Sequence, residues 1–197
     1  MQLSRVENRV QGRMSDFMKK AVFLDRDGVI NKGNALTSAS QLELIENAPE
    51  AVKKINDAGF LAIVVTNQPG IAKGFCTFDE LDRIHEKMKK LLGEKGARLD
   101  AVYICPHHPE KGFDGEVKEL KIDCDCRKPK PGLMLKAASE LDVDLSQSWM
   151  IGDSETDIEA GKSAGAKTVL ISDRRLETGA DIIRSNLLEA VEAILNG

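Results

Sequence analysis

The sequence lacks any long hydrophobic run, and this absence limits the cellular locations that we expect for the protein. No apolar stretch approaches the roughly 20 residues that a helix needs to cross a bilayer, although 42% of the 197 residues are hydrophobic. The first 16 residues are polar and contain no apolar signal-peptide segment. We therefore expect a cytoplasmic protein that does not bind a membrane.

An excess of positive charge is also missing. The formal net charge of −4 provides no general attraction to nucleic acid or to an anionic membrane surface. We therefore expect no nucleic-acid partner. An acidic protein can still hold a basic pocket, so anionic small molecules remain candidate substrates.

Cysteine is scarce, with four residues in the chain. In a reducing cytoplasm these are thiolates or metal ligands rather than disulfides. A chain of 197 residues suits one globular domain that buries roughly 70% of its unfolded surface. We assign residues 18–197 to this single domain, expected to be a monomer. Residues 1–17 form an amino-terminal extension, either disordered or absent if translation starts at Met14 or Met18.

Apolar runs alternate with amphipathic segments along the chain. The runs predict strands at 21–24, 61–65, 101–105, 149–152 and 167–171. Helices are expected at 49–58, 77–92, 131–141, 155–164 and 186–195. This alternation predicts a three-layer, Rossmann-like α/β fold with a mostly parallel sheet.

The stretch that organises the chain is an apolar strand that ends in Asp25-Arg26-Asp27-Gly28. Side chains two apart on a strand project to the same side, so Asp25 and Asp27 are expected close together. Two neighbouring carboxylates repel unless a cation lies between them, and Mg²⁺ takes such oxygen ligands. The alternative interpretation is a strand followed by an ordinary polar turn.

Polar side chains also follow other predicted strands. Thr66 and Asn67 come after the second strand, and Asp153 follows the fourth. Ligands of parallel α/β folds bind beyond the carboxyl ends of the strands, so we expect these side chains beside Asp25. Taken alone, Thr66-Asn67 would be a plausible turn.

Two further charged residues allow two interpretations each. Lys128, just before the helix at 131–141, is either a phosphate-binding group or a solvated lysine. Asp157 is either the cap of the helix at 155–164 or a group near the metal.

Four potential metal ligands flank one long loop. They are Cys105, His107, Cys124 and Cys126. Three thiolates and an imidazole satisfy the tetrahedral preference of Zn²⁺, and a closed set of four indicates a structural site. His108 is the rival to His107, and unrelated loop cysteines are the alternative. The site immediately precedes Arg127 and Lys128, so such a zinc would position the lysine.

Four motifs in chain order resemble the signature of the haloacid dehalogenase-like phosphatases. They are Asp25-x-Asp27-Gly28, Thr66-Asn67, Lys128, and Gly152-Asp153 with Asp157. The resemblance implies hydrolysis of a phosphate monoester through an aspartyl phosphate, with Asp25 as nucleophile and Asp27 as general acid and base. It also implies Mg²⁺ held by Asp25, the Asp27 backbone carbonyl and Asp153. Thr66, Asn67 and Lys128 would bind the phosphoryl oxygens.

Three segments narrow this resemblance. They are Thr66 to Ala72, Cys105-Pro-His107-His108-Pro109, and Cys124 to Gly132. They resemble the zinc-containing D-glycero-D-manno-heptose 1,7-bisphosphate 7-phosphatases and, slightly less closely, the histidinol-phosphate phosphatases. The resemblance implies that no large cap domain is present and that Arg127 and Lys128 contact substrate phosphates. It also implies a place in the synthesis of activated heptose for lipopolysaccharide or surface glycans.

Two positions near the expected substrate depart from the heptose enzymes. Gly33-Asn34-Ala35-Leu36 stands where they often carry Gly-Tyr-Val, and Ser154 stands where a lysine often follows the last motif aspartate. The long connection at 29–47 is where a heptose enzyme and a histidinol-phosphate phosphatase should differ. A non-catalytic, metal-stabilised binding protein of the same fold is the alternative from another class.

Overall fold

The computed structural model describes residues 18–174 and 178–196, so the expected extension at 1–17 lies outside the described residues. The strands are β1 (Ala21–Leu24), β2 (Leu61–Asn67), β3 (Ala101–Cys105), β4 (Trp149–Gly152), β5 (Lys167–Ile171) and β6 (Ile182–Arg184). The α-helices are α2 (Ala48–Asp57), α3 (Phe78–Gly93), α4 (Gly132–Leu141), α5 (Glu155–Ala164) and α6 (Leu187–Asn196). Three short 3₁₀ helices are η1 (Ala39–Gln41), η2 (Lys118–Leu120) and η3 (Leu145–Gln147). Every predicted strand and helix is present, with ends that differ by at most two residues.

The sheet has six parallel strands in the order β3-β2-β1-β4-β5-β6, which confirms the predicted α/β fold. This is the doubly wound order in which the chain changes direction across the sheet at β1 and β4. Leu24 of β1 aligns with Val64 on β2 and with Ile151 on β4. The residues that follow β1 and β4 are therefore neighbours at the carboxyl edge, at the switch point where such folds bind ligands.

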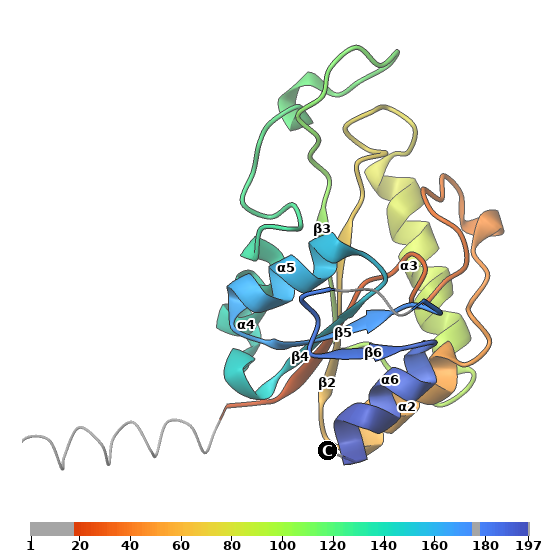
Figure 1. Cartoon of the computed structure of the whole chain (residues 1–197). Coiled ribbons are helices and arrows are strands. Elements are labelled where there is room, and N and C mark those ends of the chain that lie inside the picture. The colour runs from red at the N-terminus through yellow and green to blue at the C-terminus, as the bar shows by residue number, and fades with distance from the viewer. Residues whose placement is uncertain (1–17, 175–177, 197) are drawn as a thin grey trace, which may run out of the picture.

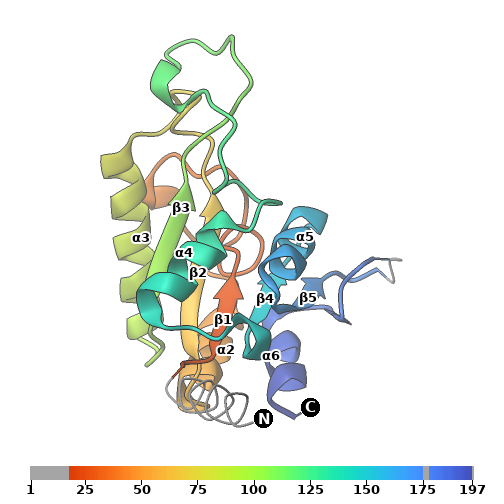
Figure 2. The same ribbon diagram turned by 90° about the vertical axis from the view of Figure 1, so that its left-hand side faces the viewer.

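Two helical layers enclose this sheet (Figures 1 and 2). Helices α2, α3 and α6 pack on one face through a core that includes Val22 and Leu24. Helices α4 and α5 cover the other face, where Phe23 is buried. Because both faces of β1 are covered, all four of its residues have 0% exposure, and the strand shows no polar alternation.

Residues 106–131 rise from the end of β3 beyond the carboxyl edge of the sheet (Figure 1). This segment docks on the turn that follows β2, where the Val117 amide donates to the Ala72 carbonyl over 3.0 Å. The backbones of Gly74 and Gly115 meet so closely that a Cβ at Gly74 would overlap the Gly115 carbonyl. Among the described residues, no separate cap domain stands over this edge.

Strand β6 has no counterpart in the sequence predictions. It is three residues long and ends in a charged Arg184, so its local pattern carries little signal. It forms through pairing with β5 and through the Asp181 carboxylate, which accepts hydrogen bonds from Thr168 N and Oγ1 over 2.8 and 2.7 Å. The helices of the described residues include none that is long and apolar enough to span a membrane.

Candidate active site

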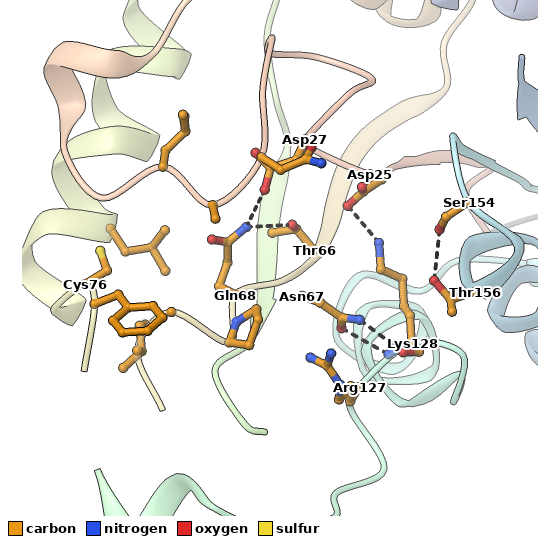
Figure 3. Close-up of a pocket in the computed structure, with 18 of the residues that line it drawn as sticks. Asp25, Asp27, Thr66, Asn67, Gln68, Cys76, Arg127, Lys128, Ser154 and Thr156 are labelled. Atoms are coloured by element: carbon orange, nitrogen blue, oxygen red, sulfur yellow. Dashed lines mark hydrogen bonds and ion pairs between the residues drawn. The ribbon is translucent and has the colours of Figure 1, made fainter. Parts of the chain in front are cut away.

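A cavity of about 320 Å³ opens at the carboxyl ends of β1, β2 and β4. Figure 3 shows the side chains that converge on it. The predicted residues that line it are Asp25, Asp27, Thr66, Asn67, Arg127, Lys128, Asp153 and Asp157. The structure therefore brings together the site residues expected from the four motifs.

Asp25 and Asp153 meet because β1 and β4 are adjacent. The Asp25 amide donates to the Ile151 carbonyl over 3.0 Å, which extends the pairing one residue past β1. Gly28 has a φ of +79°, and a Cβ at this position would overlap the Asp153 carboxylate. Glycine is thus required for the close approach of the two motifs.

Lys128 is the cation at the centre of the site. Its Nζ lies 2.7 Å from Asp25 Oδ1, 2.6 Å from Asp157 Oδ1 and 2.8 Å from the Val65 carbonyl oxygen. The side chain is 4% exposed, so the solvated-lysine alternative is wrong. Burial disfavours the ammonium, but Asp25 and Asp157 outweigh it and raise the pKa of Lys128.

The side chain of Asn67 holds the backbone of Lys128 in place. Asn67 Nδ2 donates to the Lys128 carbonyl over 3.0 Å, and the Lys128 amide donates to Asn67 Oδ1 over 3.1 Å. Both polar ends of the amide are thereby used within the protein. The Asn67 side chain consequently positions the lysine at the end of β2.

Asp157 is the cap of helix α5 and also an ion-pair partner of Lys128, while its place near a metal stays a prediction. Its Oδ2 accepts from the Ser154 amide and hydroxyl over 3.2 and 2.6 Å, which caps helix α5. Its Oδ1 pairs with Lys128. Gly152 makes room for it, because a Cβ there would overlap the Asp157 side chain.

Acidic groups outnumber cations at this edge of the sheet, and this excess of negative charge shows whether the site suits a magnesium ion. Carboxylate oxygens of Asp25, Asp153 and Asp157 all lie within 4.8 Å of one another, and Lys128 forms ion pairs with Asp25 and Asp157. Burial raises the pKa of Asp25 to about 6, although Lys128 acts to lower it. Burial and the charge of Asp157 also raise the pKa of Asp153. A hard divalent cation would offset this uncompensated negative charge, so the donor set fits Mg²⁺.

The Asp27 carboxylate has its own cation, which the sequence prediction missed. Arg26 Nε and Nη2 donate to Asp27 Oδ1 over 3.0 and 2.9 Å, and Nη2 also donates to Oδ2 over 3.0 Å. Asn31 and Gln68 each donate one further hydrogen bond to Asp27, over 3.0 and 3.1 Å. Arg26 therefore supplies a positive charge that faces Asp27, and the Mg²⁺ expected at Asp25 and Asp27 stays a prediction.

Arg26 in turn contacts a histidine on helix α3. Its Nη1 lies 3.3 Å from His85 Nε2, and His85 is 6% exposed. Burial, followed by the charge of Arg26, lowers the pKa of His85 to about 4. His85 is therefore neutral near pH 7 and accepts the hydrogen bond from Arg26.

Thr66 and Arg127 are two further predicted residues that line the cavity. Thr66 is 1% exposed, and its hydroxyl accepts from Gln68 Nε2 over 3.0 Å. Arg127 Nη1 donates to the His107 carbonyl over 3.4 Å, at the base of the 106–131 segment. An apolar wall from the 34–37 and 69–76 loops, which includes Leu36, Ile71 and Phe75, completes the cavity.

The four sulfur and nitrogen donors form a closed group, as predicted. Cys105, Cys124 and Cys126 have Sγ–Sγ separations of 3.2 to 3.5 Å, and His107 Nδ1 lies 3.2 Å from Cys126 Sγ. A tetrahedral zinc with bonds of about 2.3 Å requires edges of about 3.8 Å, so the group fits Zn²⁺ after a small expansion. Burial and the neighbouring thiols raise the pKa of Cys105, and a bound cation would offset that effect.

His108 is outside this group, so the structure decides between the two histidines. Its ring packs edge-on against Phe113, with centroids 6.4 Å apart. Lys73 and Lys121 each lie 4.6 Å from the centre of the same phenylalanine ring. His108 thus helps to hold the outer part of the 106–131 segment.

The fold, the acidic carboxyl edge and the buried lysine define the class of haloacid dehalogenase-like hydrolases, and a HAD-hydrolase-like family model matches residues 125–180. The chain is 44% identical to the D-glycero-β-D-manno-heptose-1,7-bisphosphate 7-phosphatase of Pasteurella multocida, over 78% of this chain and 82% of that protein. It is 39% identical to the corresponding α-anomer enzyme of Burkholderia mallei, over 85% of this chain and 89% of that protein.

A solved structure agrees with these relatives. The D,D-heptose 1,7-bisphosphate phosphatase of B. bronchiseptica, complexed with magnesium and phosphate, has a TM-score of 0.76 and 30% identity, over 90% of this chain and 98% of that one. The chain belongs to the D-glycero-D-manno-heptose-1,7-bisphosphate 7-phosphatase family and is a phosphoric monoester hydrolase.

We expect Cys124→Ser to lose bound zinc and to lower the free energy of unfolding on the order of 3–5 kcal/mol, because metal binding contributes to folding. Metal analysis of the purified proteins and denaturant unfolding provide the measurements. Cys76→Ser is the matched control, since Cys76 lies outside the cysteine and histidine group. Zinc-free wild-type protein of full stability would contradict a structural zinc.

We expect the wild type to lose stability on the order of 2 kcal/mol relative to His85→Gln as the pH falls from about 7 toward 4. In the unfolded chain His85 binds a proton below about pH 6.5, whereas burial and Arg26 lower its folded pKa to about 4. The stability from neutral His85 is therefore present above pH 6.5 and lost through this window. The free energy of unfolding is measured in urea for both proteins, and their difference removes the opposite contribution of Asp25, which both proteins share. Free energies of unfolding that change in parallel with pH would contradict a low folded pKa for His85.

Proposed function

We propose that this enzyme removes the 7-phosphate of D-glycero-D-manno-heptose 1,7-bisphosphate through a phosphoryl group carried on Asp25. The observation that carries the proposal is the buried Asp25 carboxylate, ion-paired with Lys128 at the cavity and neighbouring Asp153. The printed names of the relatives support the substrate. The cavity of about 320 Å³ is of a size that a small phosphorylated sugar can enter.

In the first step, an Asp25 carboxylate oxygen attacks phosphorus and the bond from phosphorus to the sugar oxygen breaks. Asp27 acts as the general acid and gives a proton to the departing sugar oxygen. The products of this step are the sugar alcohol and an aspartyl phosphate on Asp25. The 15% exposure of the Asp27 side chain at the cavity is compatible with this role.

In the second step, a water molecule attacks the phosphorus of the aspartyl phosphate. Asp27, now ionised, takes a proton from the water as general base. The bond between Asp25 and phosphorus breaks, which releases inorganic phosphate, restores the Asp25 carboxylate and leaves Asp27 protonated for the next cycle. The same residue thus serves both half-reactions at one position.

The remaining polar groups bind and orient the phosphoryl oxygens. We assign this role to the Thr66 hydroxyl, the Asn67 backbone, Lys128 and Arg127. Phosphoryl transfer depends mainly on alignment and on stabilisation of charge. Lys128, held by Asn67 and the Val65 carbonyl, is positioned for this without a change in the backbone.

Asp25, Asp153 and the Asp27 backbone carbonyl are the proposed ligands of Mg²⁺. When bound, this ion would reduce the repulsion between the anionic nucleophile and the anionic substrate. Cys105, His107, Cys124 and Cys126 are the proposed ligands of a structural Zn²⁺. The latter would rigidify the 106–131 segment, whose base carries Arg127 and Lys128.

A cytoplasmic location suits a site built from reduced cysteines. Two alternatives remain from the sequence: a histidinol-phosphate phosphatase, and a binding protein without turnover. The intact pair of Asp25 and Asp27 at one cavity favours an enzyme over the binding protein. Asn34 and Ser154, at the two positions that depart from the heptose enzymes, line the same cavity, and the printed names of the relatives are what favours the sugar phosphate.

The substrate is tested by phosphate release in the presence of Mg²⁺. The panel contains both anomers of the heptose bisphosphate, histidinol phosphate, fructose bisphosphate and an aryl phosphate. We expect kcat/KM to be at least about tenfold higher for a heptose bisphosphate than for any other compound. Preference for another compound would contradict the substrate and keep the mechanism, whereas no release from any compound would support the binding protein.

We expect Asp25→Asn to lower turnover by at least about 1,000-fold, because the amide cannot replace the carboxylate nucleophile. The fold should persist, since Lys128 keeps Asp157 and the Val65 carbonyl as partners. Phosphate release and circular dichroism measure the two effects. Asp57→Asn on the exposed surface of α2 is the control, and Asp25→Asn activity within tenfold of wild type would rule out the phosphoenzyme.

A further inference from the structure

Arg26 is a fully buried charged residue that the mechanism does not yet use. Its side chain has 0% exposure, although it lies between two aspartates at the end of β1. A buried guanidinium is stable only when its N–H donors find partners. Those partners show what the residue does.

The donors of Arg26 are divided between the Asp27 carboxylate and two fixed acceptors. Nε and Nη2 meet both oxygens of Asp27 over 2.9 to 3.0 Å, a bidentate arrangement. Nη2 also donates to Gln68 Oε1 over 3.1 Å, and Nη1 lies 3.3 Å from His85 Nε2. Gln68 and His85, which lie outside the Asp25–Asp27 stretch, therefore fix the orientation of the guanidinium plane.

His85 can serve as this acceptor only in the neutral form that leaves Nε2 without a proton. The charged groups near it are Arg26, Asp27, Glu86 and Lys89. Its burial and the adjacent guanidinium keep it neutral. Protonation would place two cations 3.3 Å apart in a buried position.

Gln68 closes the arrangement on the other side. Its Oε1 accepts from Arg26, and its Nε2 donates to Asp27 Oδ2 over 3.1 Å and to Thr66 Oγ1 over 3.0 Å. The carboxylate of Asp27 thus has a fixed plane and one fixed direction toward the cavity. Without the Arg26 contact, it would keep only the hydrogen bonds from Asn31 and Gln68.

We propose that Arg26, held by neutral His85 of helix α3 and by Gln68, is a positioning residue that aims the Asp27 carboxylate at the leaving oxygen of the substrate. This inference rests on the proposed role of Asp27 as general acid. It makes proton transfer in the active site dependent on a side chain that lies 59 positions further along the chain. General acid catalysis requires the donor within hydrogen-bond reach of the leaving oxygen, so a small rotation of Asp27 impairs it.

The test compares substrates that differ in their need for leaving-group protonation. A sugar phosphate leaves as a basic alkoxide and requires a proton, whereas p-nitrophenyl phosphate leaves as a stable anion and requires little help. Because Asp27 also acts in the second step, which both substrates share, the comparison follows the first step alone in a single turnover. We expect His85→Leu to lower the first-step rate constant by about 10- to 100-fold for the sugar phosphate and by less than about threefold for the aryl phosphate. His85→Gln should restore most of the loss, because its side-chain oxygen can accept from Arg26.

Three controls separate positioning from a purely structural role. Ile84→Val, a buried change on the same helix, should leave the ratio of the two first-step rate constants unchanged. In an Asp27→Ala background, His85→Leu should cause no further loss with the sugar phosphate. If His85→Leu fails to fold by circular dichroism, Arg26→Lys decides, because it keeps the charge and loses the bidentate contact.

Different results would overturn the positioning role of Arg26 and the proposed function of the enzyme. Equal losses with both substrates in His85→Leu, or in Arg26→Lys where that variant decides, would overturn the positioning role. An additive loss in the Asp27→Ala background would also overturn it. A wild type that hydrolyses neither substrate, or an Asp27→Ala variant with no selective loss, would instead refute the proposed function on which the inference rests.

Discussion

The ammonium of Lys128 lies within 2.8 Å of three oxygens from three different parts of the fold, contributed by Asp25, Val65 and Asp157. Taking a lysine and two carboxylates out of water costs several kcal/mol per ion, so the arrangement is stable only while the buried ammonium keeps an acidic partner. Leaving such a buried charge with no partner typically destabilises a protein by about 3–5 kcal/mol. The ion pair therefore ties β1, β2, helix α5 and the end of the 106–131 segment to one geometry, and the active site inherits that geometry.

The charged residues of the site form two groups, one around Lys128 and one around Arg26, and the two groups have different roles. Lys128 faces Asp25 and Asp157, and the excess of acid in this group fits a divalent cation. Arg26 pairs with the Asp27 carboxylate and with no other carboxylate of the described residues. Two adjacent aspartates with different counter-charges can have different tasks, because each carboxylate responds to its own surroundings. This division matches a nucleophile at one position and a proton carrier at the other.

The cysteine and histidine group reaches the active site through short covalent and hydrogen-bonded links. Cys126 is followed directly by Arg127 and Lys128, and Arg127 donates to the His107 carbonyl. The Gln68 amide donates to the Cys105 carbonyl over 2.8 Å, which joins the same group to β2. The outer part of the segment docks on the 69–76 turn, which forms the apolar wall of the cavity. A metal at this group would thus stabilise both the basic and the apolar side of the site.

Much of this architecture follows from local sequence pattern. The apolar run at 21–24, the alternation of strands and helices, and the polar residues after each strand predict a parallel sheet with a site at its carboxyl edge. The spacing of Cys105, His107, Cys124 and Cys126 predicts the closed ligand group, because donors for one ion must come in close pairs. What the pattern could not predict depends on segments far apart in the chain. The burial of Lys128, the double role of Asp157, the choice of His107 over His108, and strand β6 are all decided by tertiary neighbours. The partnership of Arg26 with His85 is the clearest case, since an arginine between two aspartates reads as a surface residue until helix α3 packs over it. A sequence specifies periodicity and the ends of elements locally, whereas a buried charge is specified by the partners that the fold brings within hydrogen-bond distance.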